Sequence, residues 1–246
     1  MSKSPPHVAV AAFFILLFSS CYSTEPLDKT EKAKAVKYED YMPKSTKRKR
    51  ESTEWSITYS YNTDNKSLPR VLLIGDSICN GYQSNVKEFL ENQANVSFWA
   101  SSKCVTDPDY FKELDLILSS YHYDYISFNN GLHSLNTFSD DFEEAFYNAI
   151  LFILDKNPDC TVFLINCTPL KSEFDSTKNK KVSELNQIIS NCAQKTHLSL
   201  VDLFHQFERE DRLDFYVDEY HFNPKGKEIQ AKLISDYIKS QINNNH

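Results

Sequence analysis

The chain has 246 residues, of which 41% are hydrophobic, and a formal net charge of −7 at pH 7. This length predicts one domain with a full hydrophobic core. Residues 29–50 carry nine Lys and Arg against three Asp and Glu, so the rest of the chain carries −13. An acidic folded part argues against nucleic acid as a partner.

The N-terminus has the pattern of an export signal. Lys3 precedes the apolar run 8–18, which is too short to span a bilayer and is followed by Ser19-Ser20-Cys21. We therefore expect residues 1–21 to be a signal peptide, or a lipoprotein signal in which Cys21 carries the lipid. Phe18 departs from the leucine usual in lipoprotein signals, so ordinary secretion is the alternative. A lipid at this end would be the chain's only membrane contact.

Residues 22–54 are polar and charged and have no apolar period, which predicts a disordered tether. Its basic run 47–50 has two interpretations, a solvated linker or a signal for the nucleus or an anionic surface. From Trp55 the composition becomes that of a folded domain, which we assign to residues 55–246.

Short apolar runs in this domain predict buried parallel strands. They cover residues 71–74, 96–99, 125–128, 161–165 and 198–201. Apolar residues at helical spacing predict helices around 142–153, 182–192 and 229–238. Asn223 and Pro224 suit the N-cap and first position of the last helix. Alternating strands and helices predict a parallel sheet covered on both faces, with its chemistry at the carboxyl ends of the strands.

The cysteines leave two interpretations open. Five follow Cys21, and an odd number cannot pair completely within one chain. Cys79 and Cys104 are expected to lie close enough for one disulfide, or to be small buried hydrophobic residues. No cysteine spacing predicts a zinc site.

Glycine marks the first candidate for chemistry. Two of the four glycines lie in Gly75-Asp76-Ser77-Ile78-Cys79-Asn80-Gly81, directly after the first predicted strand. A chain so poor in glycine keeps it where a side chain would block a turn or a close backbone approach. The segment therefore predicts a tight strand-to-helix turn that exposes Ser77 as a nucleophile.

A base for this serine is predicted near the other end of the chain. Asp218 and His221 precede the last helix, and their spacing lets the carboxylate hold one ring nitrogen while the other faces a serine. The last helix packs beside the first strand in doubly wound sheets, so Ser77 and His221 are expected to meet. Glu219 and Asp214 are the alternatives for the carboxylate.

In these motifs the chain resembles the SGNH (GDSL-type) hydrolases, in particular an exported bacterial branch, from about Trp55 to residue 238. Residues 68–78 are similar to the family's first motif, whose serine is the nucleophile, and residues 218–221 to its last motif, with the aspartate and the base. Thr168-Pro169 and Asn186 resemble one exported branch. The resemblance implies a three-layer α/β/α sandwich with a flavodoxin-like sheet of about five parallel strands. It also implies ester hydrolysis through an acyl-enzyme, without metal or cofactor.

The region after the second predicted strand departs from the family pattern. There the family has a glycine that donates a hydrogen bond to the oxyanion, beside the backbone N–H of the nucleophile, which is Ser77 in this chain. Residues 100–104 read Ala-Ser-Ser-Lys-Cys and contain no glycine. A donor needs only position and a free N–H, so we expect the backbone N–H of Ser102 or Lys103 to serve.

The region after the third predicted strand also departs from the family pattern. The family has an asparagine there, which is a second hydrogen-bond donor to the oxyanion. Aligning Gly131 with the glycine of the family motif puts His133 at the asparagine position. An imidazole N–H can donate as an amide does. We therefore assign His133 as the side-chain oxyanion donor, with Asn130 as the alternative.

Together these features predict an exported serine esterase, periplasmic, at the cell surface or secreted, that removes an acyl group such as acetyl from a carbohydrate. The substrate rests on analogy with exported family members. The altered oxyanion region supports an alternative of another class, a non-catalytic glycan-binding or interaction module on a degenerate SGNH scaffold. A thioesterase or acyltransferase that uses the same serine is a third reading.

Overall fold

The computed structural model describes residues 35–43, 51–172, 176–208 and 210–244. The predicted signal 1–21, with Cys21, lies outside these residues. Residues 36–246 form one compact unit. In the described part of the chain, no helix is both long and apolar enough to cross a membrane.

The centre of the fold is a six-stranded sheet in the order β1-β3-β2-β4-β5-β6. Every neighbouring pair except β1 and β3 is parallel. The parallel part has the flavodoxin-like order, with the first of its strands second from the edge. Each predicted strand is present, as β2 (Arg70–Gly75), β3 (Asn95–Ser101), β4 (Tyr125–Phe128), β5 (Thr161–Ile165) and β6 (Ser199–Val201).

The sequence prediction missed strand β1 (Ser56–Ser60), which pairs antiparallel with β3 at the edge of the sheet. Its register places Ser56 opposite Ser101 and Ser60 opposite Ser97. None of its five residues is fully buried. A polar edge strand of this kind lacks the continuous apolar run that marks the central strands.

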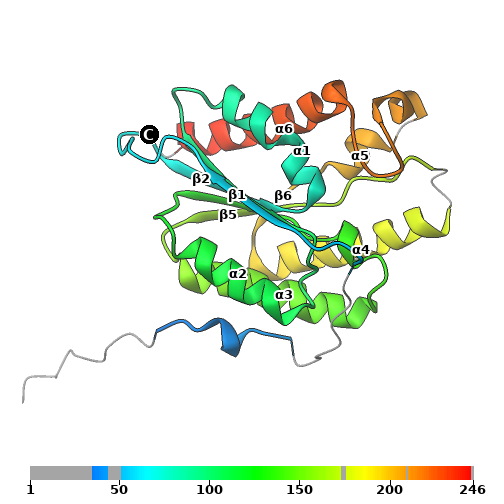
Figure 1. Cartoon of the computed structure of the whole chain (residues 1–246), viewed down its shortest axis with the longest axis horizontal. Helices are drawn as coiled ribbons and strands as arrows, with labels where there is room; N and C mark the ends of the chain where they lie inside the picture. The colour runs from blue at the N-terminus through cyan, green and yellow to red at the C-terminus, as the bar shows by residue number, and fades with distance from the viewer. Residues whose placement is uncertain (1–34, 44–50, 173–175, 209, 245–246) are drawn as a thin grey trace, which may run out of the picture. The chain divides into compact units, whose positions relative to one another are not determined.

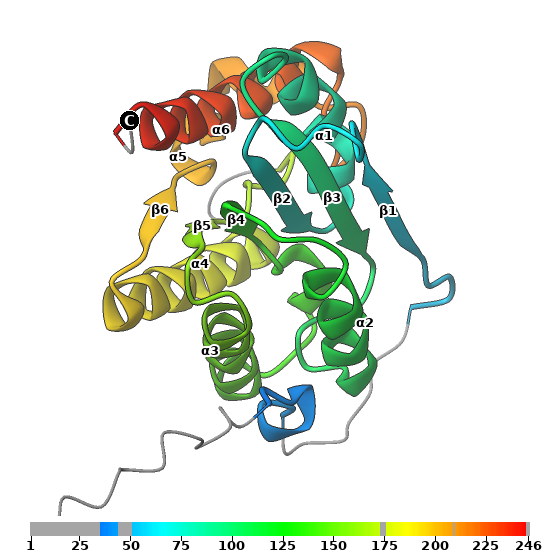
Figure 2. The ribbon, with the colours of Figure 1, turned by 90° about the vertical axis from the view of Figure 1, so that its left-hand side faces the viewer.

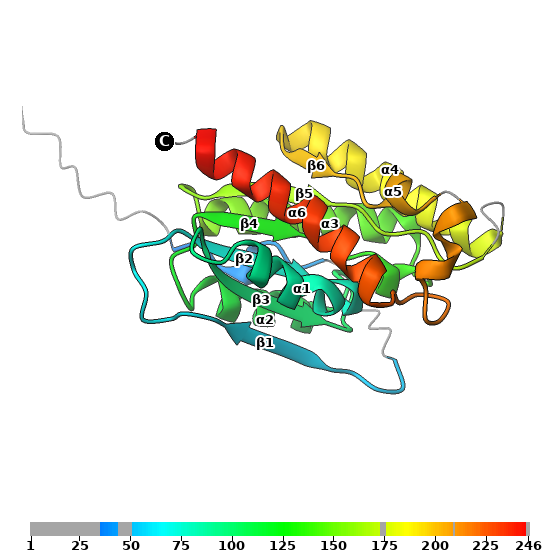
Figure 3. The same cartoon turned by 90° about the horizontal axis from the view of Figure 1, so that it is seen from above.

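Helices cover both faces of the sheet, as predicted. Figures 1 and 2 show α1 and α6 on one face and α2, α3 and α4 on the other. Figure 3 shows α1 and α6 running over the same side of the sheet. The helices are α1 (Ser77–Phe89), α2 (Pro108–Leu118), α3 (Ser139–Lys156), α4 (Thr177–Thr196), α5 (Phe204–Phe207) and α6 (Pro224–Asn244), with 3-10 turns η1 (Tyr38–Asp40), η2 (Leu132–Ser134) and η3 (Glu210–Phe215).

The start of α6 agrees with the sequence prediction. Pro224 is its first residue, and Asn223 Oδ1 accepts a hydrogen bond from the backbone N–H of Gly226 at 3.1 Å. This bond satisfies one of the donors that a helix leaves unpaired in its first turn. The cap fixes where the preceding loop ends, and that loop carries Asp218 and His221.

Part of the predicted tether packs on the domain. The Tyr41 ring lies 5.2 Å from the Phe152 ring of α3, and the Tyr41 hydroxyl donates to Asp155 Oδ2 at 2.5 Å. Val36 and Met42 also contact the core. The interpretation of residues 22–54 as a disordered tether is therefore wrong for this part, because Val36, Tyr41 and Met42 pack against the core of the domain.

The five described cysteines are free thiols, so no disulfide joins Cys79 and Cys104. Both are buried, as the alternative interpretation expects. Burial raises the pKa of the Cys79 thiol to about 12, which keeps it protonated and unreactive.

Candidate active site

Ser77 lies at the junction between β2 and α1. Asp76 caps the helix through Oδ1, which accepts the backbone N–H of Ile78 at 2.9 Å. A Cβ atom on Gly75 would lie 2.4 Å from Cβ of Cys79, so the first turn of α1 packs directly on the end of the strand. Only glycine leaves room for that approach. Ser77, the first helical residue, is thus held at the carboxyl edge of the sheet.

His221 lies in a loop that closes on itself. Tyr216 and Phe222 form an antiparallel bridge, and the Val217 N–H donates to the His221 carbonyl at 2.9 Å. The Tyr216 hydroxyl donates to the carbonyl of Pro169, after β5, at 2.8 Å. Cross-loop bonds and this anchor fix the backbone on both sides of His221.

The structure brings the three predicted residues together. His221 Nε2 lies 3.0 Å from Ser77 Oγ, although the two are 144 positions apart in the sequence. His221 Nδ1 lies 2.9 Å from Asp218 Oδ2 and 3.1 Å from Oδ1. An imidazole with a carboxylate on one nitrogen and a serine hydroxyl on the other is the arrangement that activates a serine nucleophile.

The carboxylate of Asp218 is held by more than the imidazole. Oδ1 also accepts the backbone N–H groups of Tyr220 and His221, each at 2.8 Å. Desolvation acts to raise its pKa, but the hydrogen bonds from the His221 side chain and from these backbone groups outweigh it. They lower the pKa of Asp218 to about 2. Glu219 and Asp214 were the alternatives for the carboxylate beside His221. Glu219 pairs instead with Lys178 Nζ at 2.7 Å, and Asp214 is exposed.

The prediction for the loop after β3 is wrong. The Ser102 N–H donates to the Trp55 carbonyl at 3.1 Å, and the Lys103 N–H donates to Ser101 Oγ at 3.1 Å. Strand β1, which the sequence did not reveal, brings the Trp55 carbonyl to this position. Lys103 Nζ pairs with Glu113 at 2.9 Å. These backbone donors are already used within the protein.

The alternative donor, Asn130, is also engaged. Its Nδ2 donates to the Lys103 carbonyl at 2.9 Å, and its Oδ1 accepts the Val105 N–H at 3.1 Å. The side chain is fully buried. Asn130 therefore fastens the loop after β3 to the end of β4, which is a structural role.

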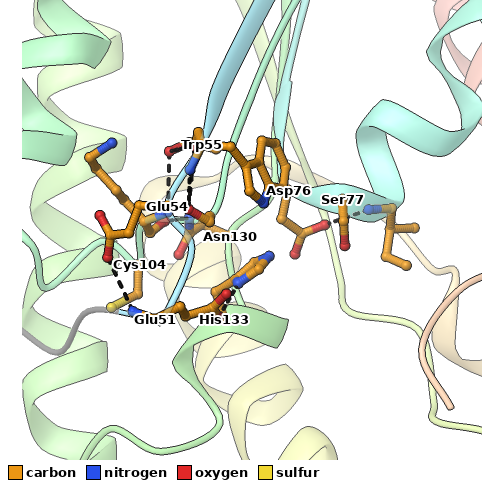
Figure 4. A network of polar contacts seen from close by, with 12 residues as sticks. Glu51, Glu54, Trp55, Asp76, Ser77, Cys104, Asn130 and His133 are labelled. Atoms are coloured by element: carbon orange, nitrogen blue, oxygen red, sulfur yellow. Dashed lines mark hydrogen bonds and ion pairs between the residues drawn. The ribbon is translucent and has the colours of Figure 1, made fainter.

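His133 remains the candidate for the side-chain donor. It lies in η2 and lines a pocket of about 320 Å³ together with Ser77 and His221. Its Nδ1 lies 2.6 Å from Glu51 Oε1, and its ring meets the Trp55 ring edge-on, with centroids 6.0 Å apart. Figure 4 shows the ring with Glu51 on one side and Asp76 and Ser77 on the other. Sequence reasoning did not identify Glu51 or Trp55 as neighbours of this site.

A second pocket, of about 260 Å³, also includes this pair. Ser77 and His221 line it together with residues of α1, the His221 loop and α6, including Asn80, Val217 and Gln230. Ser77 and His221 therefore line both cavities.

A second acid–histidine pair lies at the end of β6. His205 Nδ1 is 2.5 Å from Asp202 Oδ2. The hydrogen bond that its ring donates to the Asp202 carboxylate raises the pKa of His205. Desolvation acts to raise the pKa of Asp202, but hydrogen bonds from Asn166 and His205 lower it overall. Within the described residues, no group of three His, Cys, Asp or Glu side chains is arranged to hold a metal ion.

No protein-family model matches the sequence, and the comparison with curated proteins finds no match. Solved structures are similar in fold. The acetyl xylan esterase AlAXEase aligns with a TM-score of 0.59 and 17% identity over 69% of this chain and 99% of that chain. The fold is that of the SGNH hydrolases.

Two further solved structures share this fold. The acetylxylan esterase Axe2 from Geobacillus stearothermophilus aligns with a TM-score of 0.59 and 16% identity, over 68% of this chain and 92% of that one. A GDSL-like lipase from Bacteroides thetaiotaomicron VPI-5482 aligns with a TM-score of 0.56 and 16% identity, over 70% of this chain and 88% of that one. The three-layer architecture expected from the first and last motifs is confirmed.

Proposed function

We propose that this protein is a serine esterase that hydrolyses carboxylic ester bonds through an acyl-enzyme on Ser77. One observation carries the proposal, the 3.0 Å contact between Ser77 Oγ and His221 Nε2, with Asp218 on the other ring nitrogen. Because Nδ1 faces a carboxylate, it carries the proton of the neutral ring. Nε2 then presents its lone pair to the serine hydroxyl.

Acylation follows from this arrangement. Ser77 Oγ attacks the ester carbonyl carbon while His221 Nε2 takes the hydroxyl proton. The negative charge that forms on the carbonyl oxygen can be met by the backbone N–H of Ser77, since first-turn N–H groups have no acceptor within their own helix. The tetrahedral intermediate breaks its C–O bond to the alcohol, and the imidazolium returns the proton to that leaving group.

Deacylation repeats the sequence with water. His221 Nε2 takes a proton from water as its oxygen attacks the acyl carbon of the Ser77 ester. Collapse of the second tetrahedral intermediate releases the carboxylic acid, and the proton returns to Ser77 Oγ. The low pKa of Asp218 keeps its carboxylate ionised through both steps, which stabilises the imidazolium each time it forms.

For the substrate we propose an acyl ester of a carbohydrate, with acetyl as the acyl group. Two of the structures with similar folds carry the name of acetylxylan esterase. Two pockets lined by Ser77 support this choice, since an ester needs one space for its acyl part and one for its alcohol part. A panel of acetylated oligosaccharides and of aryl esters with longer acyl chains tests this choice. Faster hydrolysis of the long acyl chains would contradict it.

The experiment that tests the esterase itself compares the wild type with Ser77→Ala. We expect a fluorophosphonate probe to label only the wild type, and turnover of an aryl acetate to fall about 10⁴-fold or more in the variant. The melting temperature should hardly change, because Ser77 donates no bond that holds the fold. Unchanged turnover would remove Ser77 from the mechanism.

One observation favours a second candidate, a non-catalytic glycan-binding module. The donors predicted in the loop after β3, Ser102 and Lys103, are bound to Trp55 and Ser101 instead of facing the site. Such a module would leave the fluorophosphonate unreacted and would bind glycans equally well after Ser77→Ala. The labelling experiment therefore separates the two candidates.

We also propose that the protein acts outside the cytoplasm. The apolar run 8–18 and Cys21 support this proposal. Fractionation of cells that express the full chain, together with the mass of the mature N-terminus, tests both export and a lipid on Cys21. A product retained in the cytoplasm with residues 1–21 intact would contradict it.

A further inference from the structure

The pocket of about 260 Å³ beside Ser77 and His221 is lined by a buried amide that has no partner. Gln230 of α6 lines this pocket and is 1% exposed. Neither its Nε2 nor its Oε1 forms a hydrogen bond with the described residues. Buried polar atoms without a partner destabilise a folded protein, so each one calls for an explanation. The reaction steps proposed above give Gln230 no role.

The pocket lies where α1 and α6 pack together on one face of the sheet (Figure 3). A Cβ atom on Gly81 would lie 3.3 Å from Cε of Lys227, so the Lys227 side chain lies directly against α1. Gln230 follows Lys227 by three residues, which places both on the same side of α6. Both side chains line the pocket from that helix.

Two more polar side chains line this pocket without a polar partner. Asn80 of α1 and Lys227 form no side-chain hydrogen bond or ion pair within the described part of the chain. Together with Gln230 they offer N–H donors from all three side chains and carbonyl acceptors from the two amides. A hydroxyl group both donates and accepts hydrogen bonds, so it matches this set. The methyl group of an acetyl ester does neither.

The remaining wall of the pocket is apolar. It is formed by Ile78, Phe222 and Val217, and Val217 is 63% exposed. Apolar walls with a few polar groups are typical of small-molecule sites, whose volumes are about 300–1,000 Å³. A pocket of about 260 Å³ is slightly smaller, so it suits a single ring and not a long chain. A sugar ring has hydroxyl groups for the amides and C–H groups for the apolar wall.

We propose that this pocket binds the alcohol part of the ester, that this alcohol is a hydroxylated ring, and that Gln230 is the residue that selects it. The inference rests on the proposed esterase function and deepens it. A hydroxyl of the substrate accepts a hydrogen bond from Gln230 Nε2 or donates one to Oε1, and the buried amide gains the partner that the chain does not provide. The acyl group then occupies the pocket lined by Leu132 and Leu135.

The first test measures stability and needs no substrate. Methionine resembles glutamine in length and volume but has no amide, so Gln230→Met removes both unpaired atoms with little change in packing. We expect the melting temperature of the free protein to rise by about 2–4 °C. A lower melting temperature would show that the amide already has a partner in the free protein, such as a buried water, and would overturn the proposal.

The second test compares two acetate esters that share the acyl group. One is the monoacetate of methyl xyloside, whose ring carries hydroxyl groups, and the other is cyclohexyl acetate, whose ring carries none. We expect the wild type to prefer the xyloside ester about tenfold in kcat/KM, and Gln230→Met to lose that preference. Hydrolysis of cyclohexyl acetate should stay within about twofold of the wild type, because that ester forms no bond with the amide.

Gln241→Met is the matched control. Gln241 lies about three turns further along the same helix, is half-buried, and lines neither of the pockets beside Ser77. Its variant should keep the preference of the wild type for the xyloside ester. An equal loss of preference in both variants would show that the effect does not arise from the pocket, and would refute the role of Gln230.

The outcomes separate this inference from the function on which it rests. A wild type that hydrolyses both esters equally well, or a Gln230→Met variant that keeps the preference, would refute the pocket assignment and leave the esterase standing. A wild type that neither hydrolyses esters nor reacts with fluorophosphonate would refute the esterase. Calorimetric titration with methyl xyloside, which has no ester bond, then tests the pocket alone. Binding that Gln230→Met weakens about tenfold would support the pocket, and equal binding by both proteins would refute it.

Discussion

Replacement of Asp218 by asparagine tests the proposed base most sharply, because the structure fixes how the amide must sit. In the wild type, Oδ1 accepts two backbone N–H groups, from Tyr220 and His221, each at 2.8 Å. Only the carbonyl oxygen of asparagine can take that place. The amide nitrogen is then left in the position of Oδ2, which is 2.9 Å from His221 Nδ1.

The magnitude follows from the tautomer that this amide selects. An NH₂ group facing Nδ1 requires Nδ1 to accept, so the single proton of the neutral ring moves to Nε2. Nε2 then points an N–H at Ser77 Oγ and cannot take the hydroxyl proton. A wrong tautomer of this kind lowers kcat about 10⁴-fold, which corresponds to about 5 kcal/mol of transition-state stabilisation.

The assay is steady-state hydrolysis of an aryl acetate by the wild type, Asp218→Asn and Glu219→Gln. Glu219 is the adjacent carboxylate, but it pairs with Lys178, so its variant should stay within a few-fold of the wild type. Circular dichroism should show the same fold for all three proteins. If Asp218→Asn kept kcat within tenfold of the wild type, or if Glu219→Gln lost more, the assignment of the base and its partner would be refuted.

Two further predictions concern stability. Gly75→Ala should lower the free energy of unfolding, measured by chemical denaturation, by about 1–3 kcal/mol. The reason is that the new Cβ would lie 2.4 Å from Cβ of Cys79. An unchanged free energy of unfolding would show that the first turn of α1 can move away. Asp202→Asn should lower the melting temperature most between about pH 4 and 6.5. In the wild type the pKa of His205 is raised above 6.5 and the pKa of Asp202 is lowered below 3.8. Within this window both members of the pair are therefore charged and stabilise the folded state. The difference should shrink as pH rises through the folded pKa of His205, and aryl acetate turnover should not change.

The central sheet and the meeting of Ser77 with His221 could be predicted because their signals are local. Each buried parallel strand is a continuous apolar run, and strand–helix alternation restricts how the strands are ordered. The resemblance in the first and last motifs supplied the flavodoxin-like order. With that order given, a residue after the first parallel strand and one before the last helix must lie at the same edge of the sheet.

The oxyanion region could not be predicted, because its geometry depends on a strand without an apolar signal. Strand β1 is polar and pairs with β3 some forty positions further along the chain. Its pairing places the Trp55 carbonyl beside Ser102. The Ser102 N–H, which the sequence suggested as an oxyanion donor, is therefore bonded to that carbonyl. Local spacing contains no information on such a partner.

Spacing also failed to tell two similar motifs apart. Asp202 and His205 stand three residues apart, as Asp218 and His221 do, and both pairs form a carboxylate–imidazole contact. Only His221 reaches Ser77. The difference lies in where the fold places each loop, at the end of β6 or before α6, and the three-residue spacing does not record it.

The contacts of this site extend beyond the domain that composition defines. The change in composition at Trp55 suggested a boundary that leaves Glu51 in the tether, yet Glu51 holds the ring of His133. Trp55, four residues further on, exchanges hydrogen bonds with Ser102, so residues 51–55 fold onto the edge of the sheet although their composition is that of a linker. Composition records how polar a segment is, and it does not record which side chains of the folded domain that segment contacts.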